Sequence, residues 1–126
     1  MPVSTRPRVT RLKDVKKPKA EPPIALSADG AVPIDEDRTF QVTKGSAIAA
    51  TVAAPGAKNI GRELTFITGT DFAHVFTFTG TTLEDGTTGL NTTWTSAAFA
   101  GSSLTVVART ATRWSVKSFN LGTIAP

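Results

Sequence analysis

Alternation of apolar and polar residues is the feature that most constrains the fold of this 126-residue chain. It is clearest in residues 38–43 (RTFQVT), 64–68 (LTFIT) and 74–79 (HVFTFT), where large apolar side chains recur at every second position. Successive side chains of a β-strand point to opposite faces, so this period gives each strand one apolar face. Phe76 and Phe78 are therefore expected to share a face. The pattern predicts half-buried strands and requires no helix of ordinary length.

Further short strands are expected along the second half of the chain, separated by glycines and by Pro-Gly and Asp-Gly pairs. Residues 46–54 are rich in alanine, which would suit a short helix, but their β-branched residues favour a strand. Short strands spaced by about 8 to 12 residues are typical of an antiparallel β-sandwich or barrel. We therefore expect an all-β, jelly-roll-like domain over residues 28–126. The additional candidate strands are residues 92–99, 103–109, 113–119 and 121–124.

The first 27 residues have a different composition and are predicted to form an extended arm. Five of the eight prolines lie within the first 23 residues, and each proline fixes φ and removes a hydrogen-bond donor. Residues 1–19 contain seven lysines and arginines and one aspartate, a charge of +6. Because the whole chain carries +4, the remainder carries −2. The basic character therefore belongs to the arm and does not indicate a basic face on the domain.

The arm offers both charge and apolar side chains to a partner. Val9, Leu12 and Val15 recur every three residues, so one or two amphipathic helical turns could form against a partner, although so short a helix is marginal alone. Three interpretations are open: docking on an acidic protein surface, solvated disorder, and contact with nucleic-acid phosphates. The prolines and the apolar stripe favour a protein surface. The residues predicted to dock are Arg6, Arg8, Val9, Arg11, Leu12, Lys13, Val15, Lys16, Lys17 and Lys19.

Few residues suggest catalysis or metal binding. His74 is the only histidine, and Asp71 could pair with it, but a histidine in an alternating aromatic run is expected to be an exposed or edge residue of a strand. Zinc sites need several histidine or cysteine ligands, and cysteine is absent. The glycine-rich segments do not match a phosphate-binding loop. We expect no enzyme activity, no metal site and no cofactor.

Two acidic runs fit turns better than cation sites. Residues 35–37 (DED) could hold calcium through carboxylate oxygens, yet the glycine and the distant glutamate of an EF-hand loop are missing. Residues 84–86 (EDG) end in Asp-Gly, a pair that favours tight turns. Both runs are expected to be solvated turns.

The aromatic residues admit two interpretations. On one exposed face they could stack on nucleic-acid bases, whereas buried they would form the core of the domain. The core is favoured because residues 20–126 have few other large side chains and no excess of lysine and arginine to follow phosphates. The aromatic residues predicted to form the core are Phe40, Phe66, Phe76, Phe78, Trp94, Phe99 and Trp114.

The sequence predicts neither a membrane span nor a cleaved secretion signal. Its longest run of low polarity, residues 47–57, is interrupted by Thr51 and Pro55 and is shorter than the roughly 18 residues that a span requires. Met1 is followed by isolated apolar residues among charges, unlike the apolar centre of a signal peptide. We expect a protein made in a cytoplasm, with no membrane partner. The sequon at residues 91–93 (NTT) is attributed to chance.

Five stretches of the expected β-domain together resemble one protein family. They are residues 28–34 (ADGAVPI), 42–55 (VTKGSAIAATVAAP), 61–68 (GRELTFIT), 101–108 (GSSLTVVA) and 114–116 (WSV). This succession resembles the capsid decoration (cement) and head-fibre proteins of tailed bacteriophages, and it covers most of residues 28–119. Where the family commonly has Asn-Gly before the tryptophan, this chain has residues 111–113 (ATR).

The resemblance implies a structural role in a virion. Such proteins are small β-domains, typically homotrimers, that sit on the outer capsid surface and reinforce the head against the pressure of packaged DNA. The implied partners are the major capsid protein and further copies of the chain, with the arm lying across neighbouring capsid subunits. Two other functions stay open. A carbohydrate- or receptor-binding fibre domain would need Trp94, Trp114 or His74 exposed, and a nucleic-acid-binding module would use the basic arm.

Overall fold

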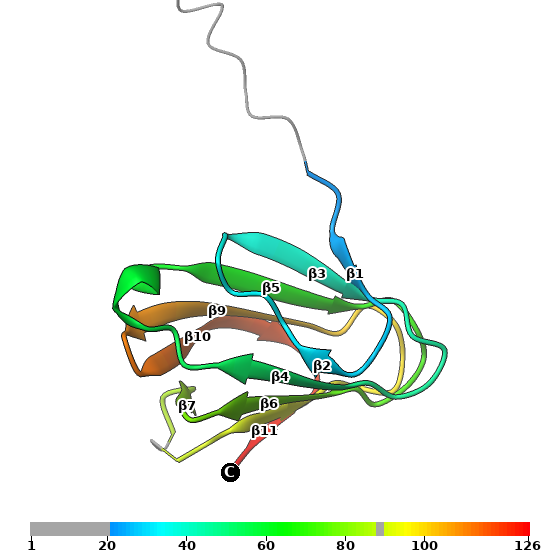
Figure 1. Ribbon diagram of the computed structural model, residues 1–126. Helices are drawn as coiled ribbons and strands as arrows, with labels where there is room; N and C mark the ends of the chain where they lie inside the picture. Colours follow the sequence, from blue (N-terminus) through cyan, green and yellow to red (C-terminus); the bar gives the residue numbers. More distant parts are fainter. Residues whose placement is uncertain (1–20, 88–89) are drawn as a thin grey trace, which may run out of the picture.

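The computed structural model describes residues 21–87 and 90–126, which form two β-sheets packed face to face and one short 3-10 helix (Figure 1). The expected all-β sandwich is confirmed. All ten residues predicted to dock, between Arg6 and Lys19, lie outside the described residues. The elements are β1 (Ile24–Leu26), β2 (Gly30–Ala31), β3 (Arg38–Val42), β4 (Ala49–Ala53), η1 (Ala57–Asn59), β5 (Glu63–Thr68), β6 (Val75–Thr79), β7 (Thr82–Glu84), β8 (Thr93–Thr95), β9 (Ser103–Thr110), β10 (Arg113–Asn120) and β11 (Thr123–Ala125).

Both sheets are mixed, whereas the sequence suggested antiparallel pairing throughout. The six-stranded sheet has the order β1-β3-β5-β9-β10-β7, and the five-stranded sheet has the order β11-β8-β6-β4-β2. β3 is parallel to β1 and β5, and β4 is parallel to β2 and β6. β9 is antiparallel to β5 and β10. The chain crosses to the other sheet after each strand from β1 to β8, so β1, β3 and β5 run in the same direction, as do β2, β4 and β6.

Three short strands were not expected from the sequence. β1, β2 and β7 have only two or three residues each, too few to display an alternating pattern. β1 lies before residue 28, where the domain was expected to begin, and its Ile24 and Leu26 pack against the core. The sandwich therefore includes part of the segment that the sequence analysis assigned to the arm. Residues 46–54, which were ambiguous, contain β4.

The core lies between the two sheets and is rich in aromatic rings. Phe40 stacks on Phe66 at 5.7 Å between ring centroids, Phe66 lies 4.6 Å from Phe76, and Phe76 lies 5.6 Å from Trp94. This row joins β3 and β5 of one sheet to β6 and β8 of the other. Six of the seven predicted core aromatics are buried. Phe99 is the exception, because β8 ends at Thr95 and leaves Phe99 in a loop.

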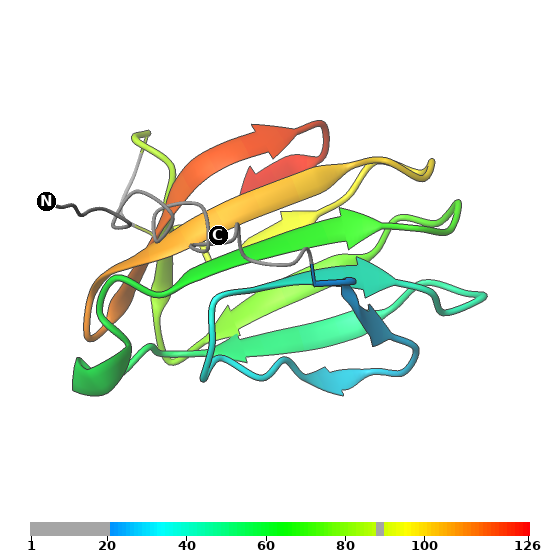
Figure 2. The same cartoon turned by 90° about the horizontal axis from the view of Figure 1, so that it is seen from above.

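The connections between strands gather at the two ends of the sandwich (Figure 2). Residues 43–48, 69–74, 96–102 and 121–122 lie at one end, which we call the loop end. η1 and the turn between β9 and β10 lie at the opposite end. Within residues 21–87 and 90–126, no helix is long and apolar enough to cross a membrane.

Candidate functional site

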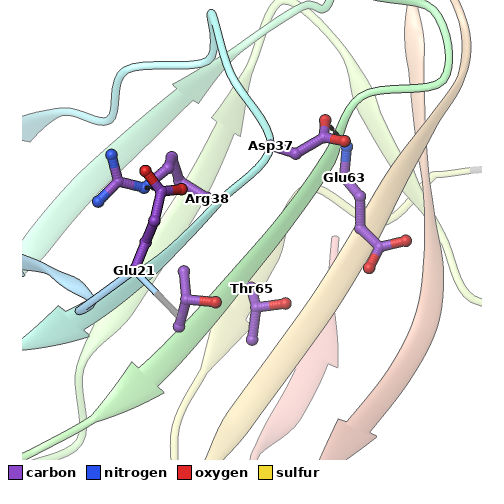
Figure 3. A pocket seen from close by; sticks show the side chains of 6 residues that line it. Glu21, Asp37, Arg38, Glu63 and Thr65 are labelled. Carbon is purple, nitrogen blue, oxygen red and sulfur yellow. Dashed lines mark hydrogen bonds and ion pairs between the residues drawn. The ribbon is translucent and has the colours of Figure 1, made fainter. Parts of the chain in front are cut away.

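A polar groove of about 300 Å³ lies on the outer face of the six-stranded sheet, where β3 and β5 begin (Figure 3). Each of its charged side chains is paired. Asp37 lies 3.3 Å from Arg62 and also accepts a hydrogen bond from the backbone N–H of Glu63, and Glu63 lies 2.9 Å from Lys117. These bonds hold the loop before β3 against β5, so the groove is accounted for by the fold. Its lining residues are Glu21, Asp37, Arg38, Thr39, Glu63 and Thr65.

The two acidic runs of the sequence also form bonds within the domain. Glu36 lies 3.6 Å from Arg38. In the second run, the Oδ1 atom of Asp85 accepts hydrogen bonds from the backbone N–H and the hydroxyl of Thr87, at 3.0 and 2.6 Å, in the expected turn. Among the described residues, no group of three or more histidine, cysteine, aspartate or glutamate side chains could hold a metal ion.

Glu84 forms several short hydrogen bonds with the strands beside it. Both of its carboxylate oxygens accept from Arg109, at 2.7 and 2.8 Å, and Ser115 donates to it at 2.6 Å. These hydrogen bonds, with the nearby charge of Arg113, lower the pKa of Glu84 from 4.5 to about 2. A carboxylate with so low a pKa stays ionised near neutral pH and is unsuited to general acid–base catalysis. It joins β7 to β9 and β10.

His74 is fully buried, so the expectation of an exposed or edge histidine is wrong. Its Nδ1 atom accepts a hydrogen bond from the backbone N–H of Ile48 at 3.0 Å. Its Nε2 atom lies 3.0 Å from the hydroxyl oxygen of Thr70. Its backbone N–H donates to the hydroxyl of Ser96 at 2.9 Å, and its carbonyl accepts from the Ser96 N–H at 2.8 Å. Because Ile48, Thr70 and Ser96 belong to three different connections, His74 ties the loop end together.

The hydrogen bonds of His74 assign its tautomer and exclude it as a catalytic base. Nδ1 accepts from an N–H and is therefore unprotonated, and the Thr70 hydroxyl donates to the carbonyl of Lys44 at 2.8 Å and so accepts from Nε2–H. Burial lowers the pKa of His74, and the charge of Lys44 lowers it further, which keeps the ring neutral. Asp71 instead accepts from the backbone N–H of Ala100 at 2.8 Å. The pair considered from the sequence is not formed.

The residues that a glycan-binding surface was expected to use are also buried. Trp94, Trp114 and His74 each have an exposed fraction of 0%. The indole N–H of Trp114 donates to the carbonyl of Ala53 at 2.9 Å, and that of Trp94 donates to the carbonyl of Leu121 at 3.3 Å. These side chains serve the core and offer no stacking surface to a ligand.

The loop end carries large apolar side chains that the sandwich leaves exposed. Phe72 is 38% exposed, Phe99 73%, Phe119 48% and Leu121 64%. We call these four residues the apolar surface. Phe99 was assigned to the core from the sequence, and the other three were not singled out. Their exposure depends on where strands end and how they bend, which alternation within a strand does not indicate.

Hydrogen bonds join the three segments that carry the four residues of the apolar surface. Residues 96–102 are joined to residues 69–74 through the bond between Ala100 and Asp71. On their other side they are joined to the end of β10, because the Asn120 amide donates to the Gly101 carbonyl at 3.2 Å and the Ser102 hydroxyl donates to the Asn120 carbonyl at 3.1 Å. The loop that carries Phe99 thus lies between Phe72 and the segment that carries Phe119 and Leu121.

Comparisons of this chain with protein-family models, with curated proteins and with solved structures found no match. The function is therefore argued from the residues of the chain and their contacts.

Proposed function

We propose that this protein is a structural, non-enzymatic component of a virion that decorates and stabilises the icosahedral head of a tailed bacteriophage as a homotrimer. In this proposal the β-sandwich is the body that sits on the outer capsid surface. The basic residues between Arg6 and Lys19, with Val9, Leu12 and Val15 as apolar anchors, dock on the major capsid protein.

The observation that carries the proposal is the division of charge along the chain. Residues 1–19 carry +6, and the remainder carries −2. Within the sandwich, acidic and basic side chains pair with each other. Examples are Glu84 with Arg109 and Glu63 with Lys117. A cationic segment joined to such a body is suited to an acidic surface on another macromolecule. The resemblance of residues 28–119 to decoration proteins makes a capsid the partner that we favour.

The chemistry of the sandwich supports a structural role over catalysis. Its histidine is neutral, buried and bonded through both ring nitrogens. Its most perturbed carboxylate, Glu84, is fixed by Arg109 and Ser115. The one groove described above is lined by side chains that hold β3 and β5 together. These three polar sites each have a bonding role in the fold.

Trimerisation would make weak docking effective. Exposed ion pairs contribute only about 0 to 1 kcal/mol each, so a single arm would bind weakly. Three arms on one trimer raise the effective concentration of each contact once the first is formed, and the gain in affinity can reach about 100-fold or more. The proposed shell, with its repeated subunits, presents such contacts at regular spacing.

The test is co-sedimentation of the full-length protein with empty capsids of the phage that encodes it. A variant with all seven lysines and arginines of residues 1–19 replaced by glutamine should lose at least about ten-fold in affinity, because it removes the charge contacts of the arm. The matched control is Lys58→Gln, which removes one exposed charge from η1 and should bind normally. If the arm variant occupied as many capsid sites as the wild type, the arm would not be needed for docking.

The full-length protein and the arm variant also test the nucleic-acid alternative. A nucleic-acid module would bind duplex DNA more tightly than capsids, and its affinity would fall with salt by a slope of about −0.9 for each phosphate contacted. The proposed function instead requires that capsids compete the protein away from DNA.

A further inference from the structure

The four residues of the apolar surface together expose an apolar area comparable to the largest patch of a typical monomeric protein. Its four side chains are exposed by between 38% and 73%. A phenylalanine side chain covers about 150 to 250 Å² when fully buried, so the four together expose on the order of 500 Å² of apolar area. Patches of about 300 to 600 Å² are the largest that monomeric proteins usually show, and they often mark contacts with other molecules.

Leu121, which belongs to this surface, has a backbone conformation that is unfavourable for leucine. Its φ is +65°, and that of Gly122 is +94°. A residue other than glycine with φ near +65° is uncommon, and asparagine or aspartate tolerates this conformation better than leucine does. Leu121 serves the fold through its carbonyl, which accepts from Trp94 and which any residue would supply. Its side chain is 64% exposed, so the sandwich gains little from it.

The turn cannot easily relax to relieve this strain. A Cβ atom at Gly122 would lie 2.6 Å from the Thr95 carbonyl oxygen and 2.6 Å from the Trp94 indole nitrogen, so the turn packs tightly on the end of β8. Leu121 is therefore held in place beside Phe119. A strained backbone at Leu121, whose apolar side chain is exposed, points to a role for that side chain in a contact outside the subunit.

The strand that carries Phe119 also has an open edge. β7 pairs with β10 only from Arg113 to Ser115. Beyond Ser115, no strand among the described residues lies on that side of β10, although β9 continues to pair on the other side as far as Asn120. The free backbone groups of such an edge can pair with an added strand.

We propose that the apolar surface and the adjoining edge of β10 form the contact between copies of this chain. The area fits this occupant. A stable interface buries about 800 Å² on each partner, and homodimer interfaces are about 65% apolar, which requires roughly 500 Å² of apolar area per copy. The apolar surface supplies that amount, and its aromatic composition is that of an interface core. Around a three-fold axis the apolar side chains of each copy can pack on those of its neighbours, and the open edge of β10 can pair with an extended segment of a neighbouring copy.

The proposed trimer requires a contact between copies, and this inference identifies the surface that makes it. The inference rests on the proposed function only in taking the number of copies to be three. The surface is also separate from the arm that is proposed to dock on the capsid. The two proposals therefore depend on different residues and different measurements.

The test is the mass of the full-length protein in solution, measured across a range of concentrations without capsids. The wild type should be an oligomer, and the double variant Phe99→Ser, Phe119→Ser should associate at least ten-fold more weakly and become largely monomeric. Both side chains are exposed, so the far-ultraviolet circular dichroism of the variant should match the wild type. The matched control is Ile60→Ser, which removes an exposed apolar residue beside η1, at the opposite end, and should leave the mass unchanged.

Leu121→Asn separates an interface role from a role in the fold. Introduced into the monomeric double variant, it should raise the midpoint of thermal unfolding, because asparagine tolerates positive φ better than leucine. Introduced into the wild type, it should weaken association. A fall in the midpoint of the monomer would show that the fold needs the leucine and would overturn the argument from strain.

The remaining outcomes are distinguishable. A wild-type oligomer that keeps its mass in the double variant would overturn this inference and leave the proposed function intact. A wild type that is monomeric at every concentration would overturn this inference and the trimer of the proposed function, while capsid binding through the arm would still be decided by co-sedimentation. Loss of capsid binding by the double variant, with a monomeric wild type, would assign the surface to the capsid and overturn the contact between copies.

Discussion

The two ends of the sandwich are held together by different kinds of interaction. At the end that carries η1, which we call the charged end, exposed ion pairs such as Asp37 with Arg62 and Glu84 with Arg109 join neighbouring segments. At the loop end, the central element is a buried neutral histidine, His74, bonded to three connections. The charged end depends on ion pairs at the surface, whereas the loop end, which also has the exposed pair of Lys44 with Asp29, depends mainly on the buried hydrogen bonds of His74.

This difference explains how the loop end can expose an apolar surface without losing its shape. A loop that shows phenylalanine and leucine to solvent cannot be ordered by those side chains, so its order must come from bonds beneath it. Buried hydrogen bonds are costly to leave unmade, whereas exposed ion pairs each contribute little. The loop end should therefore be the more sensitive to substitution, and the charged end the more sensitive to salt.

The largest expected effect comes from removing the ring nitrogens at the loop end. His74→Phe keeps a ring of similar size but leaves the buried N–H of Ile48 without its acceptor. We expect the free energy of unfolding to fall by about 2 to 3 kcal/mol, the usual cost of an unsatisfied buried group together with imperfect packing. Urea denaturation measures this loss, and hydrogen exchange should show faster exchange at Ile48 and Ser96.

Two further variants make this result specific. His74→Gln supplies a carbonyl acceptor and should recover part of the loss. Lys117→Gln removes the exposed pair with Glu63, which begins β5 at the charged end, and should cost about 1 kcal/mol or less. Equal losses for His74→Phe and Lys117→Gln would contradict the distinction between the two ends.

The sequence predicts the interior of the sandwich well because alternation along a strand is a local property that shows which side chains share its apolar face. Phe40, Phe66, Phe76 and Phe78 are buried as expected, since each lies on the apolar face of its own strand. The order of the strands could not be predicted, because alternation shows which side chains face inward and does not show which strand is the neighbour. The parallel pairing of β3 with β5 follows from crossings between the sheets that no short stretch encodes.

The loop end could be predicted only in part, because its properties depend on contacts between distant segments. His74 has aromatic neighbours in the sequence, yet its burial results from loops that are 26 and 22 residues away, at Ile48 and Ser96. Phe99 has the composition of a core residue and is exposed because the chain leaves the sheet at Thr95. The positive φ of Leu121 likewise has no sign in the sequence, because it results from the connection between two strands of different sheets.

A smaller effect is expected from pH, and it should reach the two ends in different ranges. Burial lowers the pKa of His74 below its ordinary 6.5, so the unfolded chain takes up the proton first. The contribution of His74 is therefore complete above pH 6.5 and declines as the pH falls below that value, by at most about 1.4 kcal/mol per pH unit for one proton. Lys44, which is paired with Asp29, is the charge that lowers this pKa further.

The corresponding range for the charged end is more acidic. The pKa of Glu84 is lowered from 4.5 to about 2, so its contribution is complete above pH 4.5 and is lost as the pH falls between these two values. Urea denaturation at pH 7.5, 6 and 5 should show a decline in the wild type that is absent in His74→Gln. A decline of the same slope in both proteins would assign the effect to groups other than His74.

The smallest expected effect comes from salt and should be larger for Glu84 at the charged end than for His74 at the loop end. Glu84→Gln should cost about 1 to 2 kcal/mol in dilute buffer, because it weakens the bonds from Arg109 and Ser115 but retains an acceptor, and solvent screens the pair. Raising the ionic strength from about 0.05 to 0.5 M shortens the Debye length to a few ångströms, so the difference between wild type and Glu84→Gln should shrink by about half. The difference between wild type and His74→Phe arises from a neutral buried bond and should not change. If salt reduced both differences alike, charge would contribute as much at the loop end as at the charged end, and the contrast between them would have to be abandoned.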